Sequence, residues 1–444
     1  MGKALLALIL CVTTIQTLRQ PFVGAMAYYC LAVWGPQYIW WWNFEGLRVS
    51  FIVALVAMAS LLVSWVGNGL NLSLLGNRAN YSVLILWAAY GVSYAFGPYV
   101  NTMGEVPWLT LVDLSKIILF YFVAVLLVND LNKQKYFSWI IIASMIHLTY
   151  WANAQYLTQN WGAFNFGRLM GPTSPDADSI YRDENAFSMF FVTGIPFLFY
   201  WGLHMAKPYV RYALWLVIPL AWHAVFLTGS RGGLVGLCAT ILGGLVFSRK
   251  RARFVLLMIP VFLAAFYFQA GSLLKDRSET IVEYEGESSA ETRLQAWDAA
   301  IGMLNAYPLT GVGPACFVKA MADFSPFQPR ATHSVPLQFA AEIGVLALAA
   351  YCWMVWQVLW QGVQTHRLLN HYGTLFEAEE AATIRYLNES CSVSFFGLVV
   401  CSAFLSLNYY EIFYFLLIIS CFVSYHVNAR VRAELARQPR RRWR

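Results

Sequence analysis

Long apolar runs are the feature of this chain that most restricts its fold. They are about 15 to 24 residues long, close to the ~20 residues that a helix needs to cross the hydrocarbon core of a bilayer. Hydrophobic residues make up 59% of the 444 positions and charged residues only 12%, which excludes a soluble enzyme. The alternating pattern of a membrane barrel is absent, and helices satisfy their own backbone hydrogen bonds in lipid. The sequence therefore predicts an all-α, polytopic membrane protein.

Reading the runs in order predicts thirteen helical segments, at 4–18, 22–42, 49–66, 81–97, 107–128, 136–155, 186–203, 212–228, 233–247, 254–270, 336–359, 391–406 and 410–427. Lys and Arg gather at 248–253 and after Asn428, which places these ends in the cytoplasm by the positive-inside rule. Lys3 favours an inner N-terminus, so we expect one of the first two segments to be interfacial or re-entrant, which leaves about 12 spans. Thirteen spans with an outer N-terminus are the alternative.

The spans divide the chain into four parts. Residues 1–270 form a transmembrane region, residues 271–335 a large outer loop containing amphipathic helices, residues 336–427 a second transmembrane region, and residues 428–444 a basic cytoplasmic tail. Alternation from the cytoplasmic ends places this loop and the connections near 98–106, 156–185 and 229–232 on the opposite side of the membrane.

Several charged residues that are unusual in such a chain fall on this outer side. They are Arg182, Arg231 in TGSRGGL, Arg293 in ETRLQAW, and His333 in THSVPLQ. Arginine matches phosphate geometry and stays charged, and a histidine accepts a proton near neutral pH. We therefore expect a catalytic site for an anionic substrate, with His333 as general base.

The local context of each residue supports this prediction. The glycines after Arg231 would let the backbone approach a ligand at a helix N-terminus, and Arg293 begins an amphipathic pattern that continues through Trp297. The alternatives left open are interfacial anchoring for the arginines, a surface ion pair for Arg293, and helix capping for His333. Glu342 is expected to be an intramembrane carboxylate.

One acidic string, at residues 176–185, is a candidate metal site through Asp176, Asp178, Asp183 and Glu184. Its spacing matches no calcium loop, and Arg182 competes for the same carboxylates. We therefore expect the string to cap the next span and to bind no metal. Walker and Rossmann glycine patterns are absent, so no cofactor is expected, nor is nucleic acid a predicted partner.

Four strings together resemble the motif series of the O-antigen ligase and polymerase superfamily. They are DENAFSMFF at 183–191, TGSRGGL at 228–234, RLQAWDAAIGMLNAYPLTGVGPACF at 293–317 and HSVPLQFAAEIGVLAL at 333–348. One departure is Pro314, where a further glycine is expected. The N-terminal string LRQPFVGAMAYY is also similar to O-glycosylation ligases associated with exosortase systems.

The resemblance implies a GT-C-like, metal-independent, inverting glycosyltransferase of the bacterial inner membrane, with its active site facing the periplasm. Its donor would be a glycan on undecaprenyl pyrophosphate and its acceptor the lipid A–core oligosaccharide, with membrane lipid around both. Matching the motifs assigns catalysis to Arg231, Arg293 and His333. Arg182 and Arg330 are further candidates for binding the pyrophosphate or the acceptor. A polysaccharide polymerase, a protein O-glycosylation ligase and a polysaccharide transporter are the alternatives.

Overall fold

The computed structural model describes residues 2–68, 72–175, 179–269, 288–405 and 409–437. Within these residues the chain is almost entirely helical, which confirms the all-α prediction. The helices are α1 (Gly2–Arg19), α2 (Pro21–Trp34), α3 (Pro36–Ile39), α4 (Trp41–Phe44), α5 (Val49–Asn68), α6 (Arg78–Phe96), α7 (Val106–Leu127), α8 (Leu131–Leu157), α9 (Glu184–His204), α10 (Pro208–Thr228), α11 (Arg231–Phe247), α12 (Arg251–Gln269), α14 (Ser288–Ala306), α15 (Phe317–Phe324), α16 (Val335–Gln338), α17 (Val345–His371), α18 (Ala378–Ser402) and α19 (Glu411–Arg437).

Short elements complete the fold. A π-helical turn, η5 (Phe339–Ile343), follows α16, and 3-10 turns occur at Leu72–Gly76, Val100–Thr102, Trp161–Ala163 and Gly373–Leu375. The strands β1 (Phe164–Asn165) and β2 (Arg168–Leu169) pair antiparallel, with Asn165 opposite Arg168.

Seven of the described helices are long and apolar enough to cross a membrane: α1, α5, α7, α9, α10, α17 and α19. The apolar helices α2 and α11 are shorter. The chain is therefore a multi-pass membrane protein, while the count of about 12 spans stays a prediction.

Each predicted run coincides with a helix, but two of the runs are not continuous. Gly35, with φ 67°, ends α2 inside the predicted run 22–42, and Gly344, with φ 97°, separates η5 from α17 inside the run 336–359. Glycine adopts such left-handed conformations without a side-chain clash. At Gly344 the turn also brings the next amide, of Val345, to the Pro308 carbonyl at 2.8 Å. The prediction of unbroken spans was wrong here.

The start of one predicted run was also wrong. The run at 391–406 belongs to α18, which begins at Ala378. Its polar first turns are helical because they pair with other helices: Glu379 lies 3.8 Å from Lys135, and Glu380 lies 2.9 Å from His426.

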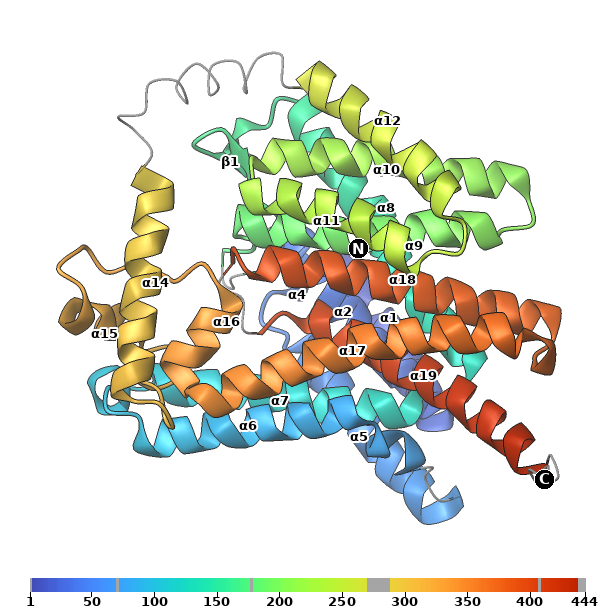
Figure 1. The fold of residues 1–444 in the computed structure, drawn as a ribbon, viewed down its shortest axis with the longest axis horizontal. Helices are drawn as coiled ribbons and strands as arrows, with labels where there is room; N and C mark the ends of the chain where they lie inside the picture. The colour runs from blue at the N-terminus through green and yellow to red at the C-terminus, as the bar shows by residue number, and fades with distance from the viewer. Residues whose placement is uncertain (1, 69–71, 176–178, 270–287, 406–408, 438–444) are drawn as a thin grey trace, which may run out of the picture.

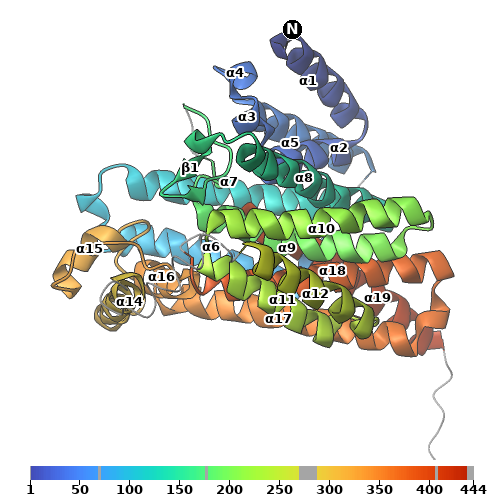
Figure 2. The ribbon, with the colours of Figure 1, turned by 90° about the horizontal axis from the view of Figure 1, so that it is seen from above.

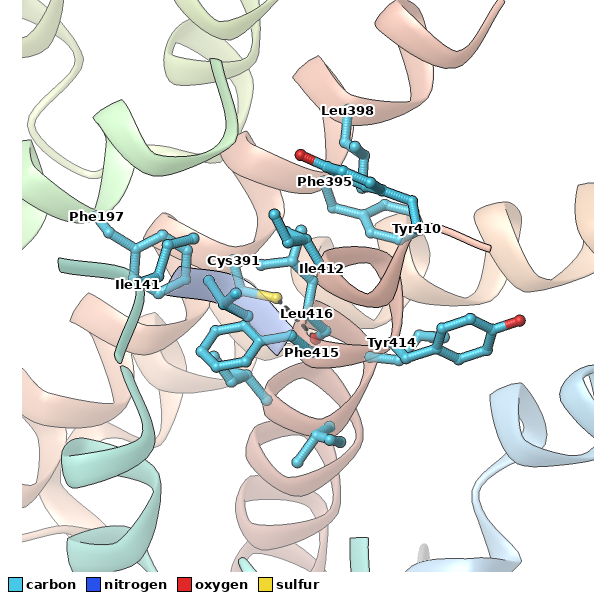
Figure 3. Close-up of a cluster of buried hydrophobic side chains, with 14 of the residues drawn as sticks. Ile141, Phe197, Cys391, Phe395, Leu398, Tyr410, Ile412, Tyr414, Phe415 and Leu416 are labelled. Atoms are coloured by element: carbon cyan, nitrogen blue, oxygen red, sulfur yellow. Dashed lines mark hydrogen bonds between the residues drawn. The ribbon is translucent and has the colours of Figure 1, made fainter. Parts of the chain in front are cut away.

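The bundle is built around α9, whose apolar stretch is 94% buried inside the protein. Figures 1 and 2 show α9 between α8, α10, α11 and α18, with α17 and α19 beyond α18. Figure 3 shows how α18 and α19 interlock, with Phe395 and Cys391 of α18 facing Ile412 and Leu416 of α19. The Cys391 thiol donates to the Leu416 carbonyl at 3.2 Å. Such close packing and interhelical hydrogen bonding are what hold helices together in lipid, where hydrophobic burial gives no net gain.

Glycines bring α11 unusually close to its neighbours. A methyl group added at Gly233 would collide with Ser188 of α9, and one at Gly236 would collide with Cys401 of α18. This small-residue packing is the common solution for helix contacts in membranes. Gly233 and Gly236 therefore serve helix packing, while approach of the backbone at Gly232 and Gly233 to a ligand stays a prediction.

A separate lobe lies at one end of the bundle, where α14 crosses the helix ends (Figure 1). Its own small core joins α14, α15 and η5 through residues that include Ala300, Met303, Phe317 and Ala341. The preceding residues 270–287, which begin the predicted outer loop, and the last residues of the predicted tail, 438–444, lie outside the described residues.

Glu342 lies in this lobe, directly before the candidate span α17, and its position within the membrane stays a prediction. It sits in η5 and is only 1% exposed. Its carboxylate accepts the Phe317 amide at 3.2 Å, and its carbonyl accepts the Gly313 amide at 2.9 Å and the Ser93 hydroxyl at 2.8 Å. Glu342 therefore connects α15, the 311–317 loop and α6.

Candidate active site

His333 lies in the loop between α15 and α16, with a left-handed φ of 48°. Such a conformation is uncommon for a residue with a side chain and persists only where its surroundings hold it. Here they do: the neighbouring Thr332 and Ser334 are buried, and the indole N–H of Trp297 donates to the Thr332 carbonyl at 2.9 Å. Trp297 belongs to α14, so this helix fixes the backbone next to the histidine.

The surroundings of His333 favour a neutral imidazole. Burial lowers its pKa below the usual value near 6.5, and the positive charges of Arg293 and Arg330 lower it further. Asp183 and Glu184 oppose this effect. Because the lowering contributions dominate, His333 is a proton acceptor at neutral pH.

Arg231 is the first residue of α11, and a hydrogen-bond network fixes its position. The Ser230 hydroxyl caps the helix by accepting the Gly233 amide at 3.1 Å, and it donates to the Asn185 side chain at 2.8 Å. Asn185 lies in the first turn of α9, which Asp183 caps through the Asn185 and Ala186 amides at 2.8 and 3.0 Å. Two helix N-termini, each carrying partial positive charge, thus lie side by side.

Asp183 therefore caps α9, as predicted for the acidic string. Its side chain is engaged by two backbone amides, and Glu184 forms an ion pair. Asp176 and Asp178 lie outside the described residues. Among the residues that the structure places, no group of three or more His, Cys, Asp or Glu side chains is arranged to hold a metal ion.

Arg293 lies in α14 and is partly buried. Its pKa is lowered first by burial and then by repulsion from Arg231 and Arg168. Two of the three predicted catalytic residues are thus close enough to repel each other, and the third, His333, senses the charge of Arg293. The repulsion between these positive charges is unfavourable, and a bound anion would relieve it.

Arg168 is a site residue that the sequence did not reveal. It lies on β2, and its guanidinium contacts the Glu184 carboxylate at 2.9 Å. This ion pair joins the hairpin to the N-terminus of α9. The only sequence signal was a lone arginine in an outer connection, just after Gly167, and such residues are usually surface charges.

The two further candidate arginines differ in position. Arg330 is partly buried, its Nε donates to the Gln328 carbonyl at 3.2 Å, and its charge acts on His333. Arg182 is exposed and directly precedes the Asp183 cap. The charges of Arg293 and Arg330 act on His333, and the charge of Arg231 acts on Arg293, so these four residues form one electrostatic neighbourhood. Arg182 lies beside it, next to Asp183.

Part of the chain is similar to a known protein family. No curated protein matches the chain. Residues 189–352 match the family model described as O-Antigen ligase. The match begins in α9, ends in α17, and includes Arg231, Arg293, Arg330 and His333, which confirms the resemblance seen in the motifs. Over residues 189–352 the chain is therefore similar to the O-antigen ligase family.

Proposed function

We propose that this protein is a glycosyltransferase that moves a glycan from undecaprenyl pyrophosphate to the lipid A–core oligosaccharide. The observation that carries the proposal is a neutral, backbone-constrained His333 in the electrostatic neighbourhood of Arg293, which in turn senses Arg231. One base and two cations are what a displacement of pyrophosphate by a hydroxyl requires. The family match supports a lipid-linked glycan as substrate.

The chemistry would proceed in one displacement. His333 accepts the proton of an acceptor hydroxyl, whose oxygen attacks the anomeric carbon of the donor sugar. The bond from that carbon to the pyrophosphate oxygen breaks, and the pyrophosphate leaves with the electron pair. Arg231 and Arg293 stabilise its charge with two parallel N–H bonds each, as guanidinium groups do for phosphate. Attack opposite the leaving group inverts the anomeric configuration.

The other arginines suit supporting roles in this reaction. Arg330 and Arg168, both near the proposed base or leaving-group site, would add positive potential for the pyrophosphate, and Arg182 would contact the donor or the acceptor at the edge. The adjacent N-termini of α9 and α11 contribute further partial charge. Arginines and helix ends would thus supply the charge stabilisation that many phosphate enzymes take from a metal ion.

The proposed topology follows from the same arrangement. We place the lobe of α14, α15 and η5 on the periplasmic side of the bacterial inner membrane, in a GT-C-like bundle of about 12 spans. In this orientation α14, which crosses the helix ends, lies along the membrane surface. The basic turn between α11 and α12 then faces the cytoplasm, in keeping with the positive-inside rule.

A transfer assay with three acceptors tests the proposal. The purified full-length protein, in nanodiscs with undecaprenyl-pyrophosphate-linked glycan, would be offered lipid A–core, a second lipid-linked glycan, or a peptide containing Ser, Thr and Tyr. We expect product on lipid A–core alone, unaffected by excess EDTA. Product only on the second glycan would establish a polymerase, and product only on peptide a protein O-glycosylation ligase.

Matched variants distinguish site chemistry from general charge effects. Arg293→Gln should abolish most transfer, whereas Arg253→Gln, an exposed arginine of α12, should not. Loss of turnover with EDTA, restored by magnesium, manganese or calcium, would contradict the metal-independent mechanism.

A further inference from the structure

A cavity lies at the end of the bundle opposite the candidate active site. It has a volume of about 190 Å³ and is formed by the end of α9, the turn between α11 and α12, and the first half of α18. Arg249, Lys250 and Arg385 line it, together with His204, Tyr200 and Tyr386. Figure 1 shows the turn into α18 on the far side of the bundle from α14. With 17 residues, α11 separates this cavity from Arg231 by ~25 Å.

The cationic side chains are held there by specific contacts. Arg385 donates to the Leu369 carbonyl at 2.6 Å and to the Asn370 side chain at 2.7 Å, which fixes its guanidinium at the end of α17. The Glu389 carboxylate accepts the backbone amide of Arg249 at 2.8 Å, which fixes the turn that carries Arg249 and Lys250. The cavity is therefore built by tertiary contacts and is not a chance gap between mobile side chains.

The charge in the cavity is positive. Glu389 is the acidic residue among those that line it, against three cations. The nearby glutamates of α18 pair elsewhere: Glu379 lies 3.8 Å from Lys135, and Glu380 lies 2.9 Å from His426. One carboxylate, already engaged by a backbone amide, leaves a net attraction for an anion.

We propose that this cavity, which we call the inner-end cavity, binds a phosphate group, supplied by the headgroup of an anionic phospholipid. Its volume equals that of roughly six water molecules at ~30 Å³ each, enough for a phosphate with part of its hydration. In the topology proposed above, the cavity lies at helix ends on the cytoplasmic side, and basic pockets between helices on that side are typical sites for lipid headgroups. The site is independent of the glycan transfer proposed above.

Lipid binding to the purified full-length protein in detergent tests this inference. Native mass spectrometry would measure the affinity for phosphatidylglycerol and for phosphatidylcholine of the same chain length, and inorganic phosphate would be added as a competitor. The wild type should bind phosphatidylglycerol more tightly. Arg249→Gln with Lys250→Gln should weaken that binding about tenfold or more, because two charge-assisted contacts are lost.

Two further variants make the test specific. The control pair Arg253→Gln with Arg432→Gln removes two exposed cations that do not line the cavity, and should leave the affinity within about twofold. Glu389→Gln keeps an oxygen for the Arg249 amide but removes the negative charge, so at pH 8 it should tighten binding. A gain of affinity cannot result from misfolding.

The outcomes separate the possible ligands. If millimolar phosphate competes with phosphatidylglycerol, the inner-end cavity accepts the phosphate group by itself. If phosphate does not compete and phosphatidylglycerol still binds more tightly than phosphatidylcholine, the cavity recognises the whole headgroup. Equal losses in the cavity pair and the control pair, equal binding of both lipids, or unchanged affinity in Glu389→Gln would each overturn the proposal.

Discussion

The backbone next to the proposed base depends on one indole hydrogen bond, which makes Trp297→Phe an informative substitution. Phenylalanine keeps an aromatic ring on α14 but removes the N–H that donates to the Thr332 carbonyl at 2.9 Å. Thr332 is 1% exposed, so water does not readily replace the lost donor. Leaving a buried acceptor without its partner costs about 1–3 kcal/mol. His333 follows directly, in a left-handed conformation that needs such support.

If this cost falls on the catalytic geometry, transfer slows roughly 5- to 150-fold, at one factor of ten per ~1.4 kcal/mol. The rate of glycan transfer would be measured at saturating donor, with donor affinity measured separately and expected to change little. A looser loop also hydrates the imidazole, so the acid limb of the pH–rate profile should move up toward 6.5. A change in stability alone would leave that limb in place.

The control is Trp87→Phe. The Trp87 indole donates to the Ser115 hydroxyl at 2.8 Å between α6 and α7, so this variant removes the same kind of bond away from the lobe. If Trp297→Phe transfers glycan at the wild-type rate with an unchanged pH profile, the bond from Trp297 to Thr332 does not support the His333 loop. Equal loss of transfer rate in both variants would also refute this role.

Three other predictions concern packing, leaving-group binding and pH. Gly236→Ala should lower the free energy of unfolding in detergent by about 1–3 kcal/mol, because its methyl group would collide with α18. Gly91→Ala, in open space on α6, should be neutral or stabilising. Equal effects of the two variants would contradict the packing argument. Arg231→Lys should stay impaired by about 10-fold or more in transfer, because a point charge does not reproduce a two-bond contact, and near-complete recovery would show a purely electrostatic role. Arg330→Gln removes a charge that lowers the pKa of His333, so that pKa rises. Because the base is active only when neutral, the acid limb of the pH–rate profile should move to higher pH, and a shift to lower pH would disprove the assignment.

The helices were predictable because hydropathy is a local property of the sequence. Of the two breaks within predicted runs, the one at Gly35 carried a local signal, because Pro36 follows the glycine, whereas the one at Gly344 depends on distant contacts. The turn at Gly344 exists because Val345 bonds to the Pro308 carbonyl, and Glu342 is buried because the Phe317 amide and neighbouring segments surround it. No property of the run itself marks either event.

The site shows the same division. Arg231, Arg293 and His333 stand out because a charged residue beside apolar runs is unusual, and motif order linked them. Arg168 was missed because its importance comes from an ion pair with Glu184 across a hairpin and a helix end. The supporting role of Trp297 likewise required knowing that α14 lies against the His333 loop.

The most direct test of the central claim is the transfer rate of His333 variants, measured with donor binding. Alanine removes the base but also strains the left-handed backbone, so His333→Asn is the better variant, since asparagine tolerates that conformation. His371→Ala, at the exposed end of α17, is the control and should transfer normally. If His333 is the general base, His333→Asn should bind donor normally and transfer ~10²–10⁴-fold more slowly. Transfer at the wild-type rate would contradict the mechanism.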